Sequence, residues 1–296
     1  ARRRPKRGAV MKILLAVDGS DYSYEAVRAL KYLRRADQLI LLHVLNVPRP
    51  AYPMMMPEVA DELYRAAERS MREDGERLLE RVRSLLPPHT GPSTTRLELG
   101  SPADMIVELA KREQVDLIVM GARGVGPIKE RLLGSVAHRV LTYASCAKLI
   151  VTTPLRALSR LLLPIAGEAD ANHALQFLKL NPFASPVELR LLTVLPHTLP
   201  PWPAGSAAFE LEATALRSAR EFIDGVGVQL RSLGYQSTAE AVLGSPVQAI
   251  IEECRKTSPD LILMGSRGSR GLGRLVLGSV SHALLHHSPF PLLVFS

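Results

Sequence analysis

Short apolar runs and longer amphipathic stretches alternate along the whole chain. In the first half the apolar runs cover residues 13–17, 39–45, 116–120 and 149–152, and residues 94–99 alternate between polar and apolar side chains. Continuous runs of valine, isoleucine and leucine this short are typical of parallel strands that are buried on both faces. We therefore predict five strands in the first half of the chain.

Stretches with helical spacing separate these strands. Asp18-Gly19-Ser20-Asp21 is a turn that supplies helix-capping side chains, so a helix is expected to follow it. A long charged helix is predicted for residues 58–86. Another is predicted for residues 103–113, because a serine followed by a proline at 101–102 suits the N-cap and the first helical residue. A last helix is expected over residues 134–143.

The second half repeats the first at a fixed distance. Leu-Gly-Ser-Pro at residues 99–102 recurs at 243–246, residues 116–124 recur almost unchanged at 260–268, and Leu-Gly-Ser-Val at 133–136 recurs at 277–280, always 144 residues later. A repeat of this length is a whole domain rather than a solenoid unit. The corresponding strands are predicted at residues 161–165, 187–195, 238–243, 261–264 and 292–295.

Alternating strands and helices with right-handed crossovers specify the fold class. We predict two tandem Rossmann-like domains, each an open five-stranded parallel sheet with helices on both faces. The first domain is expected at residues 11–153 and the second at 154–296, with residues 1–10 as a disordered basic tail or tag. Such sheets bind ligands at the carboxyl ends of their strands, where the winding direction reverses. The loops after Val17, Leu45 and Met120 are therefore candidate ligand loops.

Composition narrows the functional classes. Hydrophobic residues make up 47% and charged residues 22% of the 296 positions, which argues against wholesale disorder. Two cysteines, Cys146 and Cys254, are too few for a disulfide framework or a cysteine-rich zinc site and fit a reducing cytoplasm. No apolar run reaches the roughly 18–20 residues that a membrane span needs. No signal peptide is expected, because the apolar stretch after the basic N-terminus is too short.

The net charge of +8 is concentrated at one end of the chain. Arg2, Arg3, Arg4, Lys6 and Arg7 contribute five positive charges, so the remainder is close to neutral. A nucleic-acid or membrane contact would rest on these residues alone. We expect neither nucleic acid nor a membrane as the partner of this protein.

A glycine-rich loop after the fourth strand of each half carries the chemistry. In the first half, Gly121 and Gly124 are followed, after nine residues, by Gly134 and Ser135. Glycines let the backbone approach a ligand closely, and a Gly-Ser pair that opens a helix offers N–H groups and a hydroxyl to a phosphate. The alternative is a tight strand exit followed by an ordinary serine N-cap. Because the second half has the same spacing, we favour an ancestral phosphate site.

This spacing, Gly-x2-Gly-x9-Gly-Ser after a strand that ends in Met-Gly, resembles the universal stress protein family. The first strand, which leads into Val17-Asp18-Gly19-Ser20, matches as well, and the duplication is similar to that of the tandem two-domain members. The resemblance covers residues 11–296. It implies an α/β fold that binds adenine nucleotides; many members bind ATP and some do not.

The resemblance also implies roles for individual residues of the first domain. Asp18 would lie beside the ribose, and Val44 would meet the adenine. Met120 and Gly121 would line the same pocket. The loop that cradles the phosphates would consist of Gly124, Gly134, Ser135 and Val136.

The second domain departs from this pattern at one position. Ala166 stands where the first domain has Asp18, and Glu168 is the alternative carboxylate two residues further on. A lost charge-assisted hydrogen bond is worth about 1.5–3 kcal/mol, or about ten- to a hundred-fold in affinity. We therefore expect a second, weaker site made of Val194, Met264, Gly265, Gly268, Gly278, Ser279 and Val280.

Other residues are given structural roles. The histidines, such as His138 and His282, have no carboxylate or cysteine at ligand spacing, so we expect no metal site built from side chains. Residues 54–56, three methionines between prolines, are expected to form an apolar lid, and residues 196–205 with Trp202 are their counterpart. Arg123 and Arg267 could each contact a phosphate or remain solvated.

The expected function is binding of ATP, with Mg²⁺ accompanying the nucleotide, by a cytoplasmic stress-response protein whose conformation or partner choice depends on occupancy. The alternatives are a regulatory interaction module with degenerate, empty pockets and a slow ATP hydrolase. No evident nucleophile and base pair is present, which favours binding over catalysis. We further expect the two domains to pair through their final strands, residues 148–152 and 291–295, and the chain to form a homodimer and bind an unidentified protein partner.

Overall fold

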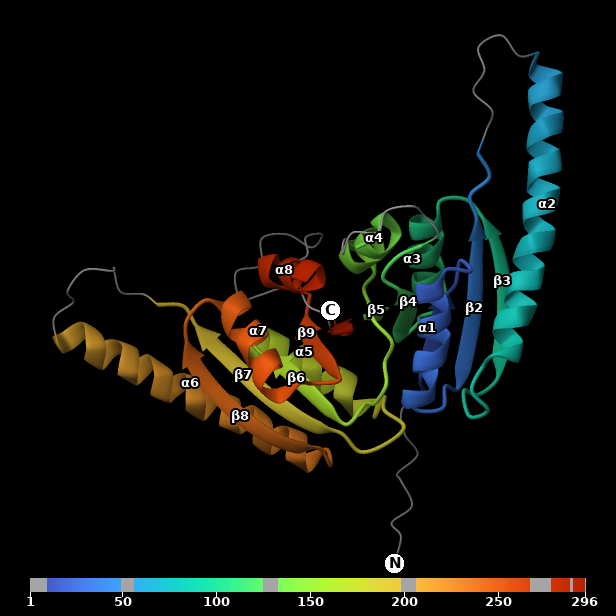
Figure 1. The fold of residues 1–296 in the computed structure, drawn as a ribbon. Helices are drawn as coiled ribbons and strands as arrows, with labels where there is room; N and C mark the ends of the chain where they lie inside the picture. Colours follow the sequence, from blue (N-terminus) through green and yellow to red (C-terminus); the bar gives the residue numbers. More distant parts are fainter. Residues whose placement is uncertain are drawn as a thin grey trace, which may run out of the picture. The chain divides into compact units, whose positions relative to one another are not determined.

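The computed structural model describes residues 10–48, 56–124, 133–197, 206–266, 278–287 and 290–295 (Figure 1). The chain divides into two compact units, residues 10–151 and the residues from 152 onward. Several predicted features lie outside the described residues: the basic tail up to residue 9, two of the three lid methionines, the Trp202 loop, and Arg267 and Gly268 of the second glycine loop.

The first unit is a five-stranded sheet in the order β3-β2-β1-β4-β5, and its described strand pairs are all parallel. The helix α1 packs on β4 and β5, and α2 packs on β2 and β3, whereas α3 and α4 pack against each other. The elements of this unit are β1 (Lys12–Ala16), α1 (Asp21–Ala29), a 3-10 turn (Leu30–Tyr32), β2 (Gln38–Leu45), α2 (Pro57–Ser84), β3 (Ser93–Leu99), α3 (Pro102–Arg112), β4 (Leu117–Gly121), α4 (Ser135–Tyr143) and β5 (Ala147–Val151).

The second unit repeats this topology, with the strand order β8-β7-β6-β9-β10 and parallel pairing between neighbours. Its elements are β6 (Arg160–Pro164), α5 (Glu168–Lys179), β7 (Glu188–Leu195), α6 (Ser206–Ser232), β8 (Gln236–Leu243), α7 (Pro246–Thr257), β9 (Leu261–Gly265), α8 (Ser279–His287) and β10 (Leu292–Phe295). The predicted fold class, two tandem Rossmann-like domains with helices on both faces of each parallel sheet, is confirmed.

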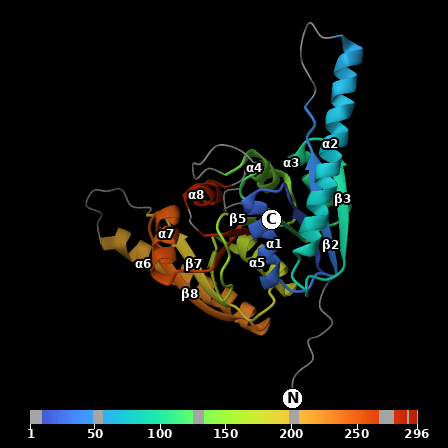
Figure 2. The ribbon, with the colours of Figure 1, turned by 45° about the vertical axis from the view of Figure 1, so that its right-hand side comes forward.

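The long helix α2 lies along β2 and β3 and continues past the ends of these strands (Figures 1 and 2). Its buried residues, Gly75, Leu79 and Val82, all belong to its C-terminal part. The sheet therefore stabilises only the last turns of this helix, and the earlier turns depend on good helix formers and on ion pairs such as Glu68 with Arg72.

The reversal of winding in the first unit lies at β1. This strand pairs with β2 on one side and with β4 on the other, and Ala16 at its end lies opposite Met120 at the end of β4. The residues that follow β1 and β4 therefore emerge next to each other at the carboxyl edge of the sheet. This is the position where open parallel sheets bind ligands.

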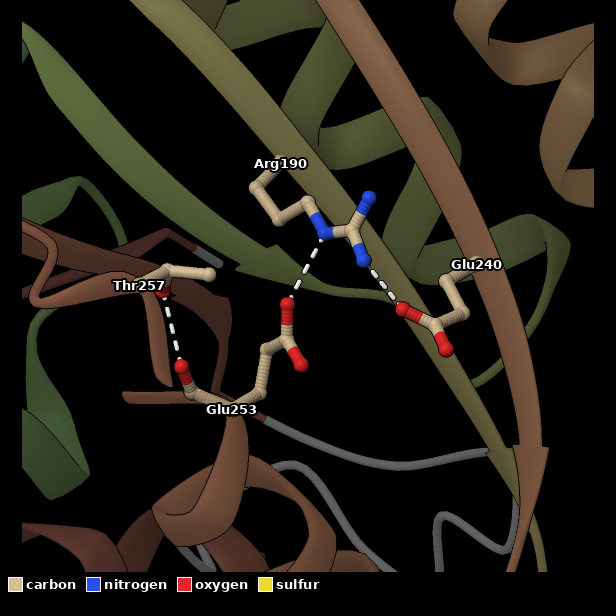
Figure 3. Close-up of polar contacts among 4 residues, drawn as sticks. All are labelled: Arg190, Glu240, Glu253 and Thr257. Atoms are coloured by element: carbon tan, nitrogen blue, oxygen red, sulfur yellow. Dashed lines mark hydrogen bonds and ion pairs between the residues drawn. The ribbon is translucent and has the colours of Figure 1, made fainter. Parts of the chain in front are cut away.

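The second domain contains an ion-paired arginine, Arg190, that the first domain lacks (Figure 3). Arg190 on β7 donates from Nε to Glu253 of α7 at 2.9 Å, and from Nη2 to Glu240 of β8. The Glu253 side chain is only 6% exposed. Ile40 and Leu109, both buried, stand at the equivalent positions of β2 and α3 in the first domain. The second domain thus has an ion pair where the first has two buried apolar side chains.

Candidate functional site

Asp18 follows β1 and is held by the first turn of α1. Its Oδ1 accepts hydrogen bonds from the backbone N–H of Ser20 at 3.0 Å and from the Ser20 hydroxyl at 2.6 Å. Gly19 between them has a φ of +81°, a conformation that glycine adopts without strain. Ser20 is the N-cap of α1 and accepts from the N–H of Ser23. The turn therefore both starts the helix and orients the carboxylate.

Both ends of the glycine loop are fixed to the sheet. The N–H of Ala122 donates to the carbonyl of Val151, and the N–H of Gly134 donates to the carbonyl of Ala122, at 3.0 and 2.9 Å. The second domain has the same two bonds, from Ser266 to Phe295 and from Gly278 to Ser266, both at 2.8 Å. The helix that follows each loop thus begins at an equivalent place in both domains.

The glycines of the first loop serve different purposes. A β-carbon on Gly121 would lie 2.6 Å from the backbone carbonyl carbon of Tyr22 and 2.9 Å from the nitrogen of Ser23, so this glycine allows α1 to pack against β4. A β-carbon on Gly124 would instead lie 2.5 Å from Oδ2 of Asp18. Gly121 fits the structural alternative of a tight strand exit, whereas Gly124 allows the Asp18 carboxylate to approach the loop backbone closely.

The remaining predicted residues of the first site lie at the same edge of the sheet. Met120 is buried and Val44 half-buried near the ends of β4 and β2. Gly134 is the N-cap of α4, and no side chain caps this helix. Ser135 is exposed and Val136 half-buried in its first turn. An uncapped helix N-terminus beside a carboxylate offers N–H groups to an anion and an acceptor to a hydroxyl.

The sequence did not indicate Tyr22 as a residue of the site, and it indicated Ser20 only as a helix cap. The guanidinium carbon of Arg123 lies 5.5 Å from the centre of the Tyr22 ring, and its Nη1 donates to the Tyr22 hydroxyl at 3.4 Å. Whether Arg123 also contacts a phosphate stays a prediction; in the structure its half-buried side chain lies over an aromatic ring. Tyr22 and Arg123 are far apart in sequence, so no local pattern indicated this contact.

The second site has a different carboxylate from the one expected. Ala166 is exposed, and Glu168 is exposed as well. The side chain that lies against the backbone of Ala166 is Asp170, whose Oδ2 accepts from the Ala166 N–H at 3.1 Å. Asp170 is 8% exposed, and its burial raises the pKa of the carboxyl group, although the Ala166 N–H and the charge of His173 act in the opposite direction.

Replacing Asp170 with asparagine is expected to stabilise the second domain at neutral pH. Because the folded-state pKa of Asp170 lies above its unfolded value, the ionised carboxylate costs stability once the pH exceeds the unfolded pKa of about 4. Each pKa unit of this difference corresponds to about 1.4 kcal/mol. Asparagine keeps an acceptor for the Ala166 N–H without the charge.

Urea unfolding of wild type and Asp170→Asn at pH 7.5 and pH 3.5 measures this effect. The variant should be more stable at pH 7.5 and similar to wild type at pH 3.5. The exposed Glu168→Gln serves as the control for removing one charge from the first turn of α5. A lower stability of Asp170→Asn at pH 7.5 would mean that the helix N-terminus favours the charge more than burial opposes it.

The described residues offer neither a membrane span nor a cluster of metal ligands. None of the helices there is both long and apolar enough to cross a bilayer. In the same part of the chain, no three side chains of histidine, cysteine, aspartate or glutamate gather as they would around a metal ion.

Comparison with known proteins identifies the family. The model of the universal stress protein family matches residues 10–152 and again residues 158–296. Universal stress protein YxiE of Bacillus subtilis is 34% identical over 149 residues, which are 47% of this chain and 97% of that protein. A universal stress protein of Thermus aquaticus is 36% identical over 143 residues, 47% of this chain and 96% of that protein.

A solved structure extends the likeness to both domains. The crystal structure of a universal stress protein from Archaeoglobus fulgidus covers 96% of this chain and 98% of its own, with a TM-score of 0.67 and 21% identity, and so shows the fold. The family model matches each half of the chain in turn. This protein therefore belongs to the universal stress protein family, as a tandem member with two copies of the family's domain.

Proposed function

We propose that the first domain binds ATP between Asp18 and the glycine loop, and that occupancy changes the conformation of the protein or its choice of partner. The observation that carries this proposal is the close approach of Oδ2 of Asp18 to the backbone of Gly124, where a β-carbon would lie 2.5 Å from this oxygen. Gly124 is exposed, and a carboxylate oxygen beside an exposed glycine is suited to accept hydrogen bonds from ribose hydroxyls.

The phosphates would lie toward α4. Its N-terminal N–H groups and the exposed Ser135 hydroxyl offer donors to an anion. Mg²⁺ would be held by the phosphates and water, since this ion usually binds through substrate phosphates. We propose binding rather than rapid hydrolysis, because Ser20 holds Asp18 in a position suited to recognition.

The runner-up function is a regulatory interaction module with empty pockets. One observation favours it for the second domain: Ala166 offers no carboxylate, and the nearby Asp170 already accepts a backbone hydrogen bond. The pairing of the two domains through their final strands, the homodimer and the protein partner remain predictions from the sequence.

The two sites are expected to differ in affinity. Calorimetric titration of nucleotide-stripped protein with ATP should show one stronger site and a second that is about ten- to a hundred-fold weaker or not measurable. Asp18→Ala should weaken the stronger site by the same factor, because the ribose loses its charged acceptor. The reciprocal variant, Ala166→Asp, should strengthen the second site.

Two results would contradict the proposal in different ways. No heat of ATP binding by the wild type would favour the interaction module. Two equal sites that Asp18→Ala leaves unchanged would show that this carboxylate does not determine affinity.

A further inference from the structure

We propose that Ser20 is a positioning residue that connects the carboxylate of Asp18 to the glycine loop. Its hydroxyl oxygen lies 2.6 Å from Oδ1 of Asp18 and 3.1 Å from the carbonyl oxygen of Arg123. The N–H of Ser23 donates to the same oxygen at 3.2 Å. Ser20 is 9% exposed, so water has little access to these bonds.

The hydroxyl of Ser20 has one proton for two acceptors. The N–H of Ser23 occupies one of its lone pairs, and the proton lies toward Asp18 at 2.6 Å, with the carbonyl of Arg123 as a weaker second acceptor at 3.1 Å. The backbone N–H of Ser20 also donates to the same Oδ1 of Asp18. Both bonds fix Oδ1, which leaves Oδ2 directed toward Gly124. Ser20 thereby determines which oxygen of the carboxylate faces the proposed ligand.

The residue before Gly124 is held at a second point. The side chain of Arg123 lies over the ring of Tyr22, two residues after Ser20 in the first turn of α1. This turn therefore holds Arg123 by both its carbonyl oxygen and its guanidinium group. The beginning of the glycine loop and the orientation of Asp18 are fixed by the same turn.

The second domain lacks the whole arrangement. After β6, the positions equivalent to Asp18, Ser20 and Tyr22 hold Ala166, Glu168 and Asp170. Asp18 and Ser20, which are hydrogen-bonded to each other, and Tyr22, which contacts Arg123, are thus all different in the second domain. The joint loss of Asp18 and Ser20 is expected if they act together, because Ser20 has no carboxylate to orient once Asp18 is missing.

The consequence rests on the proposed function: Ser20 should allow the first site to distinguish ribose from a sugar without hydroxyls. The experiment measures the dissociation constants of ATP and 2′,3′-dideoxy-ATP by calorimetry for wild type, Ser20→Ala, Ser20→Thr and Ser23→Ala. Ser23 is the matched control, since it is buried in the same turn and its hydroxyl donates to the carbonyl of Ser20 without contacting Asp18.

The wild type should prefer ATP by about 10- to 100-fold. Ser20→Ala should lower this ratio at least about threefold, because one of the two bonds that orient Oδ1 is lost. Ser20→Thr should restore the ratio, and Ser23→Ala should keep it even if both affinities change. A ratio in Ser20→Ala equal to that of the wild type would overturn the inference.

A second measurement does not need the nucleotide. Crystal structures of wild type and Ser20→Ala without ligand should show the Asp18 carboxylate oriented toward Gly124 only in the wild type. An unchanged Asp18 side chain in the variant would also refute the role of Ser20. If the wild type bound neither nucleotide, the proposed function would fail, and these structures would still decide whether Ser20 positions Asp18.

Discussion

Replacing Arg190 with leucine is expected to lower the free energy of unfolding of the second domain by about 3 kcal/mol at neutral pH. The variant leaves Glu253, whose side chain is 6% exposed, without the guanidinium that now neutralises it. Breaking a buried ion pair by removing one partner costs about 3–5 kcal/mol. The lower end applies because Arg190 is itself 31% exposed. Urea denaturation that follows the unfolding of the second domain measures the loss.

The double variant Arg190→Leu with Glu253→Leu is the control, because the first domain has Ile40 and Leu109 at these positions. It should recover most of the stability, since replacing a buried ion pair with apolar residues of similar volume is often neutral or stabilising. Glu240 would remain on β8, where its side chain is 36% exposed and can be hydrated. A double variant as unstable as the single one would show that the geometry of β7 and α7 requires the pair.

Gly124→Val is expected to reduce the affinity of the first site for ATP by at least about 100-fold without lowering the melting temperature. Its β-carbon would lie 2.5 Å from Oδ2 of Asp18, so the carboxylate must move away. Two losses of affinity then combine: the ribose loses its acceptor, and the valine side chain stands where the ligand is proposed to lie. Gly124 is exposed and has no positive φ, so the backbone should accept valine.

Gly121→Ala is the contrasting variant. Its β-carbon would lie within 3 Å of backbone atoms of Tyr22 and Ser23, so α1 must move away from β4 and the melting temperature should fall. Calorimetry with ATP and thermal unfolding of both variants separate the two effects. Unchanged ATP affinity in a folded Gly124→Val protein would refute the assignment of Gly124 to the loop that cradles the phosphates.

The strands could be predicted from the sequence because each is a run of buried apolar residues, and their bounds differ from the structure by at most two residues. The largest differences are at β5, which starts at Ala147 rather than 149, and at β8, which starts at Gln236 rather than 238. Lys148 obscured the start of β5, since a lysine is rarely part of a buried strand; its Nζ donates to the carbonyl of Ala144.

Contacts between distant segments could not be predicted in this way. Asp18 and the glycines were indicated by their places after strands, whereas the bond between Ser20 and Arg123 joins residues 103 positions apart. The ion pair of Arg190 with Glu253 spans 63 positions. In both cases the partner is determined by the packing of a helix against the sheet, which hydrophobic periodicity alone does not specify.

The hydrogen bonds that close each glycine loop have an evolutionary consequence. Because Gly134 bonds to Ala122, and Gly278 to Ser266, the two ends of each loop meet at a fixed point of the sheet. For a loop closed in this way, even a doubling of length costs only about 0.6 kcal/mol of closure entropy. Insertions between these points should therefore cost little folding stability, so after the duplication one copy could change the length of its ligand loop while keeping its fold.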